Sequence, residues 1–205
     1  MTRPPILQPG QSYTFSKYFE LSFPPEDILA ELNCLYKRER LLLPKSDFNI
    51  INLIENLQRI LERNLKRVRL LSEEARKQAI ISPILLEICD VTETQLNIEY
   101  PINISALLQG SLDYYISQGR GLLVIEAKQA DLSKGFTQLA VELIALDQWI
   151  NNDSNLLYGA VTTGEDWRFG LYKRQEKLIV EDFKLYRVPE ELAELVSILI
   201  GIIMG

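Results

Sequence analysis

The sequence predicts one α/β (α+β) domain in which helices flank a mixed central β-sheet. Apolar residues recur at helical spacing from about residue 24 to residue 88, strand-like runs begin near residue 96, and helical spacing returns over residues 133–150. The chain has 205 residues, of which 47% are apolar and 24% are charged. It is therefore long enough to bury a core, and its composition excludes a disordered chain or a disulfide scaffold.

Residues 1–70 are expected to form a mainly helical N-terminal region that packs on the core. The aromatic stretch 13–19 predicts a strand or an ordered arm. Pro24-Pro25-Glu26-Asp27 then opens a helix, because proline suits the first turn and acids suit the positive end of the helix dipole. Its apolar stripe consists of Ile28, Leu29, Leu32 and Leu35. The segment 43–46 ends this helix, and apolar steps of three and four residues predict a longer one from about 47 to 66.

Residues 71–188 are expected to form the core of the domain. Ser72 is placed to cap a helix whose residues Ile81, Ile84, Leu85 and Ile88 face that core. The remaining elements are a strand around 96–100, strands at 111–116 and 122–128, a helix at 133–150, and strands near 156–162, 167–172 and 177–183. Residues 189–205 form an apolar C-terminal helix, which either packs on the core or joins two copies in a homodimer.

Composition excludes several classes of chemistry and location. The chain has no histidine, which excludes Ser-His-Asp and Cys-His catalysis and histidine zinc sites. Cys34 and Cys89 lack a CxxC pattern and are expected to be reduced thiols. The start of the chain lacks a signal-peptide pattern, and the apolar stretch 195–204 is too short to span a membrane. We therefore expect a cytoplasmic protein without a membrane partner.

Charge is distributed unevenly along the chain. The net charge of −6 argues against a protein that simply coats nucleic acid. Between Lys37 and Lys77, however, 11 basic residues stand against six acidic residues, a local balance of +5. This tract is either the solvated face of a helix or a surface that contacts a polyanion.

A hairpin is predicted to bring two carboxylates and a lysine together. Gly119-Arg120 fits a two-residue type II′ turn between two strands. If Gln118 pairs with Gly121, then Asp113 lies opposite Glu126, and Lys128 points to the same face. The apolar run just before Glu126 indicates a central buried strand, so charge at its end needs a partner.

Two interpretations account for this cluster. Carboxylates about 5 Å apart repel unless one is protonated or a cation lies between them. A Mg²⁺ ion, or Mn²⁺ in its place, held by Asp113, Glu126, a backbone carbonyl and water would resolve the repulsion. Lys128 would then orient or help to deprotonate an attacking water. The alternative is an Asp/Glu/Lys salt-bridge cluster at the end of a strand.

Asp113, followed after the hairpin by Glu126-Ala127-Lys128, resembles the motif of the PD-(D/E)xK nuclease superfamily, which has the restriction-endonuclease-like fold. A closer resemblance, to the N-terminal nuclease domain of type I restriction enzyme restriction subunits, covers Leu71 to Tyr172, about half the chain. Its matching segments are Ser72–Leu85, Gly110–Tyr114 with Leu123–Lys128, Gln138-Leu139, and Thr162–Phe169. The sequence departs from the pattern in having Leu112 before Asp113, where the motif has proline, and Glu142 where relatives often carry tyrosine.

The resemblance implies a Mg²⁺-dependent endonuclease, a hydrolase that binds DNA and cleaves its phosphodiester bonds. In that case Asp113, Glu126 and the backbone carbonyl of Ala127 hold the metal, Lys128 activates water, and Gln138 contributes to the site. A glutamate of the opening helix supports a second metal or the water network. Glu74 is preferred to Glu73, because Glu74 shares the helical phase of the core-facing residues, whereas Glu73 suits the helix cap.

A second function class stays open. A non-catalytic protein-interaction module could keep the nuclease fold and bind a protein partner through its N-terminal region or its apolar tail. Titration with Mg²⁺ or Mn²⁺ separates the two classes, because a ligand that binds only the folded state raises its stability.

Overall fold

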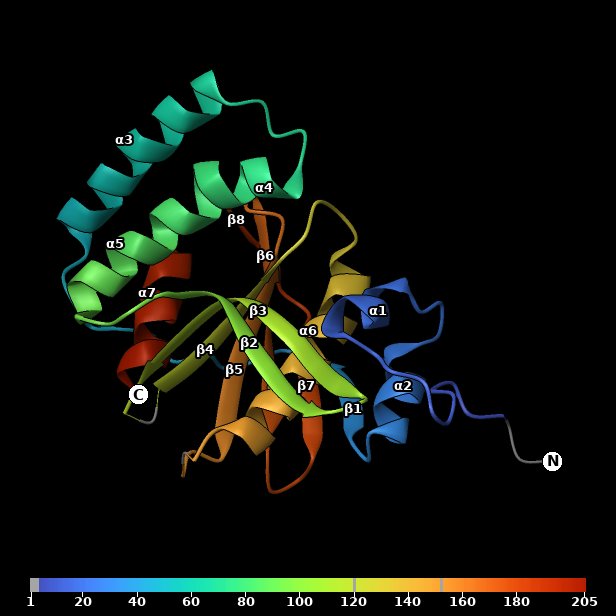
Figure 1. The fold of residues 1–205 in the computed structure, drawn as a ribbon. Coiled ribbons are helices and arrows are strands. Elements are labelled where there is room, and N and C mark those ends of the chain that lie inside the picture. The colour runs from blue at the N-terminus through green and yellow to red at the C-terminus, as the bar shows by residue number, and fades with distance from the viewer. Residues whose placement is uncertain (1–3, 120, 152) are drawn as a thin grey trace.

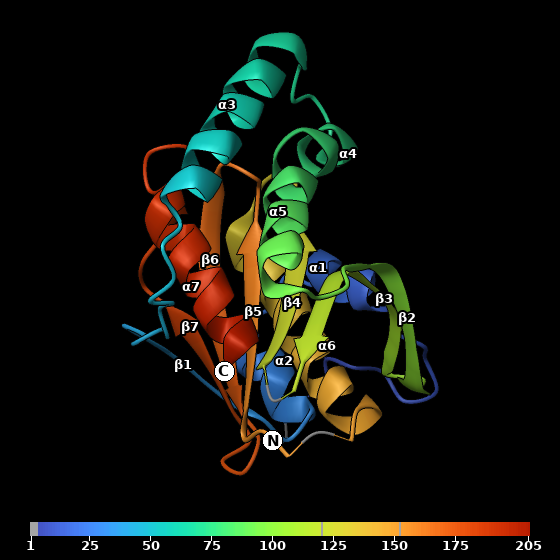
Figure 2. The same ribbon diagram turned by 90° about the vertical axis from the view of Figure 1, so that its left-hand side faces the viewer.

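A computed structural model of the protein describes residues 4–119, 121–151 and 153–205. These residues form an eight-stranded mixed sheet in the order β1-β7-β6-β5-β4-β3-β2, with β8 beside β6, and helices cover both faces of the sheet (Figures 1 and 2). The fold class predicted from the sequence, a mixed sheet flanked by helices, is confirmed.

The elements follow the predicted order closely from residue 72 onward. The helices are α1 (Phe15–Glu20), α2 (Pro25–Glu31), α3 (Ile51–Arg67), α4 (Glu73–Arg76), the π-helical turn η1 (Lys77–Ile81), α5 (Ser82–Thr92), α6 (Leu132–Trp149) and α7 (Leu192–Met204). The strands are β1 (Leu35–Glu39), β2 (Asn97–Ser105), β3 (Leu108–Gln118), β4 (Gly121–Ala127), β5 (Leu156–Thr162), β6 (Asp166–Lys173), β7 (Leu178–Asp182) and β8 (Tyr186–Arg187).

The aromatic stretch 13–19 is mostly helical, so the expected strand or arm is wrong there. Phe15 and Tyr18 lie three residues apart and are both buried, which a helix allows because such residues share a face. The Tyr18 hydroxyl donates to the carbonyl of Leu107 at 2.8 Å, and α1 packs on α6 and β3. This helix forms one wall of the site described below.

Leu35 does not extend the apolar stripe of α2, which is a second correction. The helix ends at Glu31, and Leu35 begins β1, an edge strand that pairs in parallel with β7. The sequence pattern did not predict this strand, because three of its five residues are charged: Lys37, Arg38 and Glu39. Charge on an edge strand protects its unpaired backbone from other strands.

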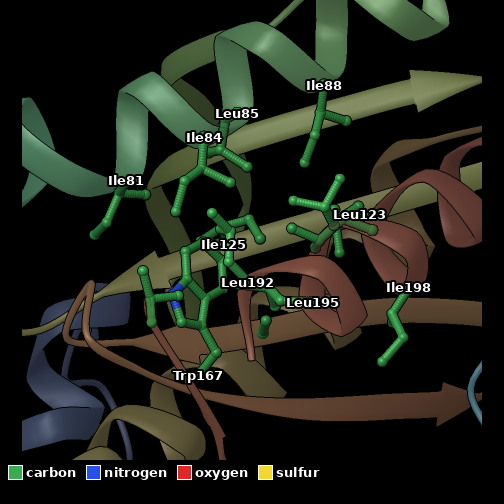
Figure 3. Close-up of a cluster of buried hydrophobic side chains, with 14 of the residues drawn as sticks. Ile81, Ile84, Leu85, Ile88, Leu123, Ile125, Trp167, Leu192, Leu195 and Ile198 are labelled. Carbon is green, nitrogen blue, oxygen red and sulfur yellow. The ribbon is translucent and has the colours of Figure 1, made fainter. Parts of the chain in front are cut away.

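Two apolar layers hold the sheet. On one face η1, α5 and α7 form an apolar layer with β3 to β6, and α3 packs on these helices from outside. Figure 3 shows α5 over Leu123 and Ile125 of β4, beside Leu195 of α7. The other face packs against α1, α2 and α6. The apolar residues of α7, expected either in the core or at a dimer contact, are buried within the chain up to Ile203.

Other expectations concern the thiols, the long helix and the membrane. Cys34 and Cys89 are buried free thiols. The helix α3 begins at Ile51, four residues later than expected, and it lies along α5 on the side away from the sheet (Figure 1). Within the described ranges, no helix is both long and apolar enough to cross a membrane.

Candidate functional site

The β3–β4 hairpin has the predicted register. Gln118 pairs with Gly121, Tyr115 with Val124, and Tyr114 with Ile125. The turn was expected at Gly119-Arg120; Gly119 has a φ of 55°, and Arg120 lies outside the described residues. The regular pairs end at Tyr114–Ile125, beyond which the Ala127 N–H donates to Oδ2 of Asp113 at 2.9 Å.

Four predicted site residues meet at one surface depression of about 350 Å³. These are Asp113 of β3, Glu126 and Lys128 at the end of β4, and Gln138 of α6. The rest of the lining comes from α1, the α4–η1 segment and the strands β2 and β3: Thr14, Phe15, Ser16, Glu73, Lys77, Glu99, Gly110 and Ser111. Segments far apart in the sequence therefore form one polar site at a strand end.

Glu126 is the most deeply buried acid of the depression, with 1% of its surface exposed. Its Oε1 accepts a hydrogen bond from Gln138 Nε2 at 2.7 Å and forms an ion pair with Lys128. With Glu126 and the neighbouring Glu142 both ionised, no group of the described residues donates to the Oε2 of Glu126. Burial, and then the charge of Asp113, raise the pKa of Glu126, whereas Lys128 lowers it. One oxygen of this carboxylate is thus without a donor unless Glu142 is protonated.

Glu142 extends this network into α6, and the sequence marked it only as a departure from the family pattern. Gln138 Nε2 also donates to Glu142 Oε1 at 2.9 Å, so one amide bridges two buried carboxyl groups. Burial, and then the charge of Glu126, raise the pKa of Glu142 well above its ordinary value. A protonated Glu142 can donate a hydrogen bond to Glu126. When both carboxyl groups are ionised, the Oε2 atoms of Glu126 and Glu142 both lack a donor among the described residues.

Asp113 has a cationic partner that the sequence reasoning missed. Lys77 Nζ lies 2.6 Å from Asp113 Oδ1, 3.3 Å from Glu73 Oε1 and 3.6 Å from Glu99 Oε1. Burial lowers the pKa of Lys77, but the attraction and hydrogen bond of Asp113 outweigh burial and raise it. The available sequence signal was the i, i+4 spacing of Glu73 and Lys77.

The structure places Glu73 at the depression, whereas the preferred Glu74 does not line it. Glu74 Oε1 accepts from Gln78 Nε2 at 2.9 Å on an exposed part of the helix. The helical phase of Glu74 was counted back through η1, where π-helical bonding joins residues five apart and changes the residues per turn. A phase carried across that turn therefore points to the wrong glutamate.

Lys128 is held in place by close packing on both sides. Its Nζ lies 5.2 Å from the centre of the Phe19 ring, and its side chain is 12% exposed. A Cβ at Gly135 of α6 would lie 2.9 Å from Lys128 Cγ, so glycine allows the helix to pass this close. Burial lowers the pKa of Lys128, but its attraction to Glu126 outweighs burial and raises it.

Comparison with known proteins finds no matching family model, and no curated protein matches the chain. Across the described residues, no group of three or more histidine, cysteine, aspartate or glutamate side chains could hold a metal ion. The site is therefore characterised by its geometry: two carboxylates, each paired with a lysine, and one buried carboxylate oxygen without a donor.

Proposed function

We propose that the protein is a Mg²⁺-dependent endonuclease-like phosphodiesterase that hydrolyses DNA, with a PD-(D/E)xK site of the restriction-endonuclease type. The observation that carries the proposal is the convergence of Asp113, the buried Glu126 and Lys128 at one depression, where the charge of Asp113 raises the pKa of Glu126. Two carboxylates that repel each other are stabilised by a cation between them, so a metal ligand is expected there. The resemblance to type I restriction nuclease domains supports the same interpretation.

The residues fit a magnesium ion. Mg²⁺ is commonly bound by one or two carboxylates and keeps several waters, so Asp113 and Glu126 suffice without a third acid. The backbone carbonyl of Ala127 would complete the protein ligands, and Mn²⁺ would serve as a substitute. When bound, the ion would polarise the scissile phosphate and lower the pKa of water.

The remaining residues have roles that follow from their contacts. Lys128, which is fixed by Glu126 and by the ring of Phe19, orients the attacking water and offsets charge that develops on the phosphate. Gln138 holds the Oε1 of Glu126, and Glu142 in turn holds the amide of Gln138. Both α6 residues position the carboxylate rather than contact the substrate.

A basic segment that precedes the site in the chain favours a polyanionic substrate. Five exposed cations lie on the C-terminal half of α3 and just after it: Arg59, Arg63, Lys66, Arg67 and Arg69. The chain then returns to the site, where Gln129 Nε2 donates to the Leu71 carbonyl at 3.0 Å. DNA phosphates can therefore meet positive charge in the segment that leads into the site, despite the net charge of −6.

Cleavage of DNA tests the proposal. Supercoiled plasmid, single-stranded DNA and branched DNA are incubated with Mg²⁺ or Mn²⁺ and the wild type, Asp113→Ala, Lys128→Ala or the exposed-surface control Asp90→Ala. We expect cleavage by the wild type and the control, and roughly a 10²-fold or larger loss in the two site variants. Equal cleavage by all four proteins would indicate a contaminating nuclease and would contradict the proposal.

The second candidate is the non-catalytic protein-interaction module. The observation that favours it is that Lys77 and Lys128 already neutralise Asp113 and Glu126. The sequence predicted such a salt-bridge cluster with Lys128 alone. In that case neither Mg²⁺ nor Mn²⁺ raises the melting temperature, and no DNA is cleaved. A metal-induced rise that Asp113→Ala abolishes would argue against the module.

A further inference from the structure

We infer that the ammonium group of Lys77 competes with a divalent metal ion for Asp113. Lys77 thereby weakens the binding of that ion at the site. The inference rests on the proposed function, because it concerns the same carboxylates. It goes beyond that function in assigning to Lys77, which lies outside the E-x-K motif, control over metal affinity.

The contacts of Lys77 carry this inference. Its Nζ lies among three carboxylates from three elements: Asp113 of β3 at 2.6 Å, Glu73 of α4 at 3.3 Å and Glu99 of β2 at 3.6 Å. The side chain is 12% exposed, so water screens this charge only in part. Lys77 therefore holds a position that a small cation would otherwise favour.

Glu99 is placed in this group by an unusual backbone conformation. It lies between the strand pairs Ile98–Tyr114 and Tyr100–Leu112, which puts it beside Asp113 in the β2–β3 register. Its φ of 52° is left-handed, a conformation that is uncommon for a residue other than glycine and persists only when its surroundings enforce it. The strand is thus locally distorted where its acid reaches Lys77.

The two carboxylates of the depression are consequently unequal. Both oxygens of Asp113 have partners, since Oδ1 accepts from Lys77 and Oδ2 accepts from the Ala127 N–H. Glu126, by contrast, keeps its Oε2 without a donor. A divalent ion at Glu126 meets the ammonium group of Lys128, which belongs to the E-x-K motif, and at Asp113 it meets the additional positive charge of Lys77.

The same geometry provides a place for the displaced ammonium. When a divalent ion takes over Asp113 Oδ1, the ammonium of Lys77 can stay bound to Glu73 and Glu99, which already lie within 4 Å of it. Lys77 therefore stabilises the acidic group in the absence of metal and lowers the affinity for metal. Its removal has opposite effects on these two properties, which a purely structural lysine would not produce.

Manganese binding, measured by calorimetry and by the metal-induced change in melting temperature, tests the inference without a cleavage assay. We expect Lys77→Met to bind Mn²⁺ about tenfold or more tightly than the wild type, because a unit charge beside the ion has gone. Without metal, its melting temperature falls. The control is Lys37→Met, which removes another ion-paired lysine from β1 at the opposite edge of the sheet and leaves the affinity unchanged.

Two further variants keep the test valid if Lys77→Met fails to fold. Lys77→Gln removes the charge but keeps a hydrogen-bond donor, so it should also tighten Mn²⁺ binding, whereas Lys77→Arg keeps the charge and should not. Asp113→Ala identifies the measured site. Unchanged or weaker binding in both neutral variants, while the wild type still binds Mn²⁺ through Asp113, would overturn the inference alone.

The remaining outcomes separate this inference from the proposed function. If neither the wild type nor the neutral variants bind Mn²⁺, both ideas fail. If only the neutral variants bind Mn²⁺, Lys77 blocks the site, which supports the inference and contradicts metal-dependent cleavage by the wild type.

Discussion

Two glutamates are buried on the same face of the sheet, and their surroundings differ in kind. Glu126 of β4 and Glu181 of β7 are 1% and 3% exposed. Both oxygens of Glu181 have partners: Oε1 accepts from Arg168 Nη1 at 2.8 Å, and Oε2 accepts from the Tyr36 hydroxyl at 2.5 Å. Within the described residues, the cationic and amide partners of Glu126 contact Oε1, and Oε2 has a donor only when Glu142 is protonated.

We interpret this difference as one between a structural charge and a charge that the proposed function would use. The protein satisfies Glu181 completely, and Arg38 adds a further ion pair at 3.4 Å, so folding alone explains this network. Glu126 lies next to the like charge of Asp113, and its second oxygen has a donor only when Glu142 is protonated, so folding alone accounts for this carboxylate less completely. Incomplete satisfaction at the rim of a depression is therefore the feature that points to a ligand.

The largest predicted effect lies at the satisfied glutamate. Glu181→Ala removes the partner of Arg168, whose side chain is 12% exposed, and leaves a buried charge uncompensated. We expect a loss of about 3–5 kcal/mol in the free energy of unfolding, measured by urea denaturation. The exposed-site variant Asp90→Ala should change it by less than about 0.5 kcal/mol. A small loss in Glu181→Ala would remove the distinction between the two glutamates.

Sequence reasoning succeeded where a rule acts over a short distance. The turn chemistry at Gly119 and the alternation of β3 and β4 predict which residues face one another, so the approach of Asp113 and Glu126 follows from the register. The helix cap at Ser72 was predicted correctly for the same reason, because it joins residues three positions apart. The Ser72 hydroxyl accepts a hydrogen bond from the Ala75 N–H at 3.1 Å. Most of the elements after residue 72 could be predicted in this way.

The features that the sequence did not predict depend mainly on contacts between residues far apart in the chain. The pairing of Lys77 with Asp113 depends on how η1 meets β3, and no spacing rule connects residues 36 positions apart. Glu73 was passed over because a π-helical turn shifts the helical phase. The strand β1 was missed because its partner, β7, comes about 140 residues later in the chain.

An intermediate effect is expected from pH, through Glu142. Its pKa is raised, by burial first, so between the ordinary carboxyl range and that raised value the folded protein binds more protons than the unfolded chain. The free energy of unfolding of the metal-free protein should therefore fall as pH rises through this window, by up to about 1.4 kcal/mol per pH unit for this group.

Glu142→Gln checks the assignment of this pH dependence. The glutamine cannot ionise, yet its oxygen can still accept from Gln138 and its amide can donate towards Glu126. Urea denaturation at several pH values should give a flatter profile for this variant than for the wild type. An unchanged slope would place the proton elsewhere in the network.

The smallest effect on stability is expected at Glu126, the residue with the strongest functional indication. In Glu126→Gln, the oxygen keeps its bond from Gln138, the amide can donate to the open Oε2 of Glu142, and repulsion from Asp113 disappears. These gains offset the lost ion pair with Lys128, so the free energy of unfolding without metal should change by less than about 1 kcal/mol. Mn²⁺ should no longer raise the melting temperature of this variant, although it raises that of the wild type. If Glu126→Gln lost as much free energy of unfolding as Glu181→Ala, Glu126 would also be a structural charge. A stable Glu126→Gln variant whose melting temperature does not respond to Mn²⁺ would instead show that this carboxylate binds the metal.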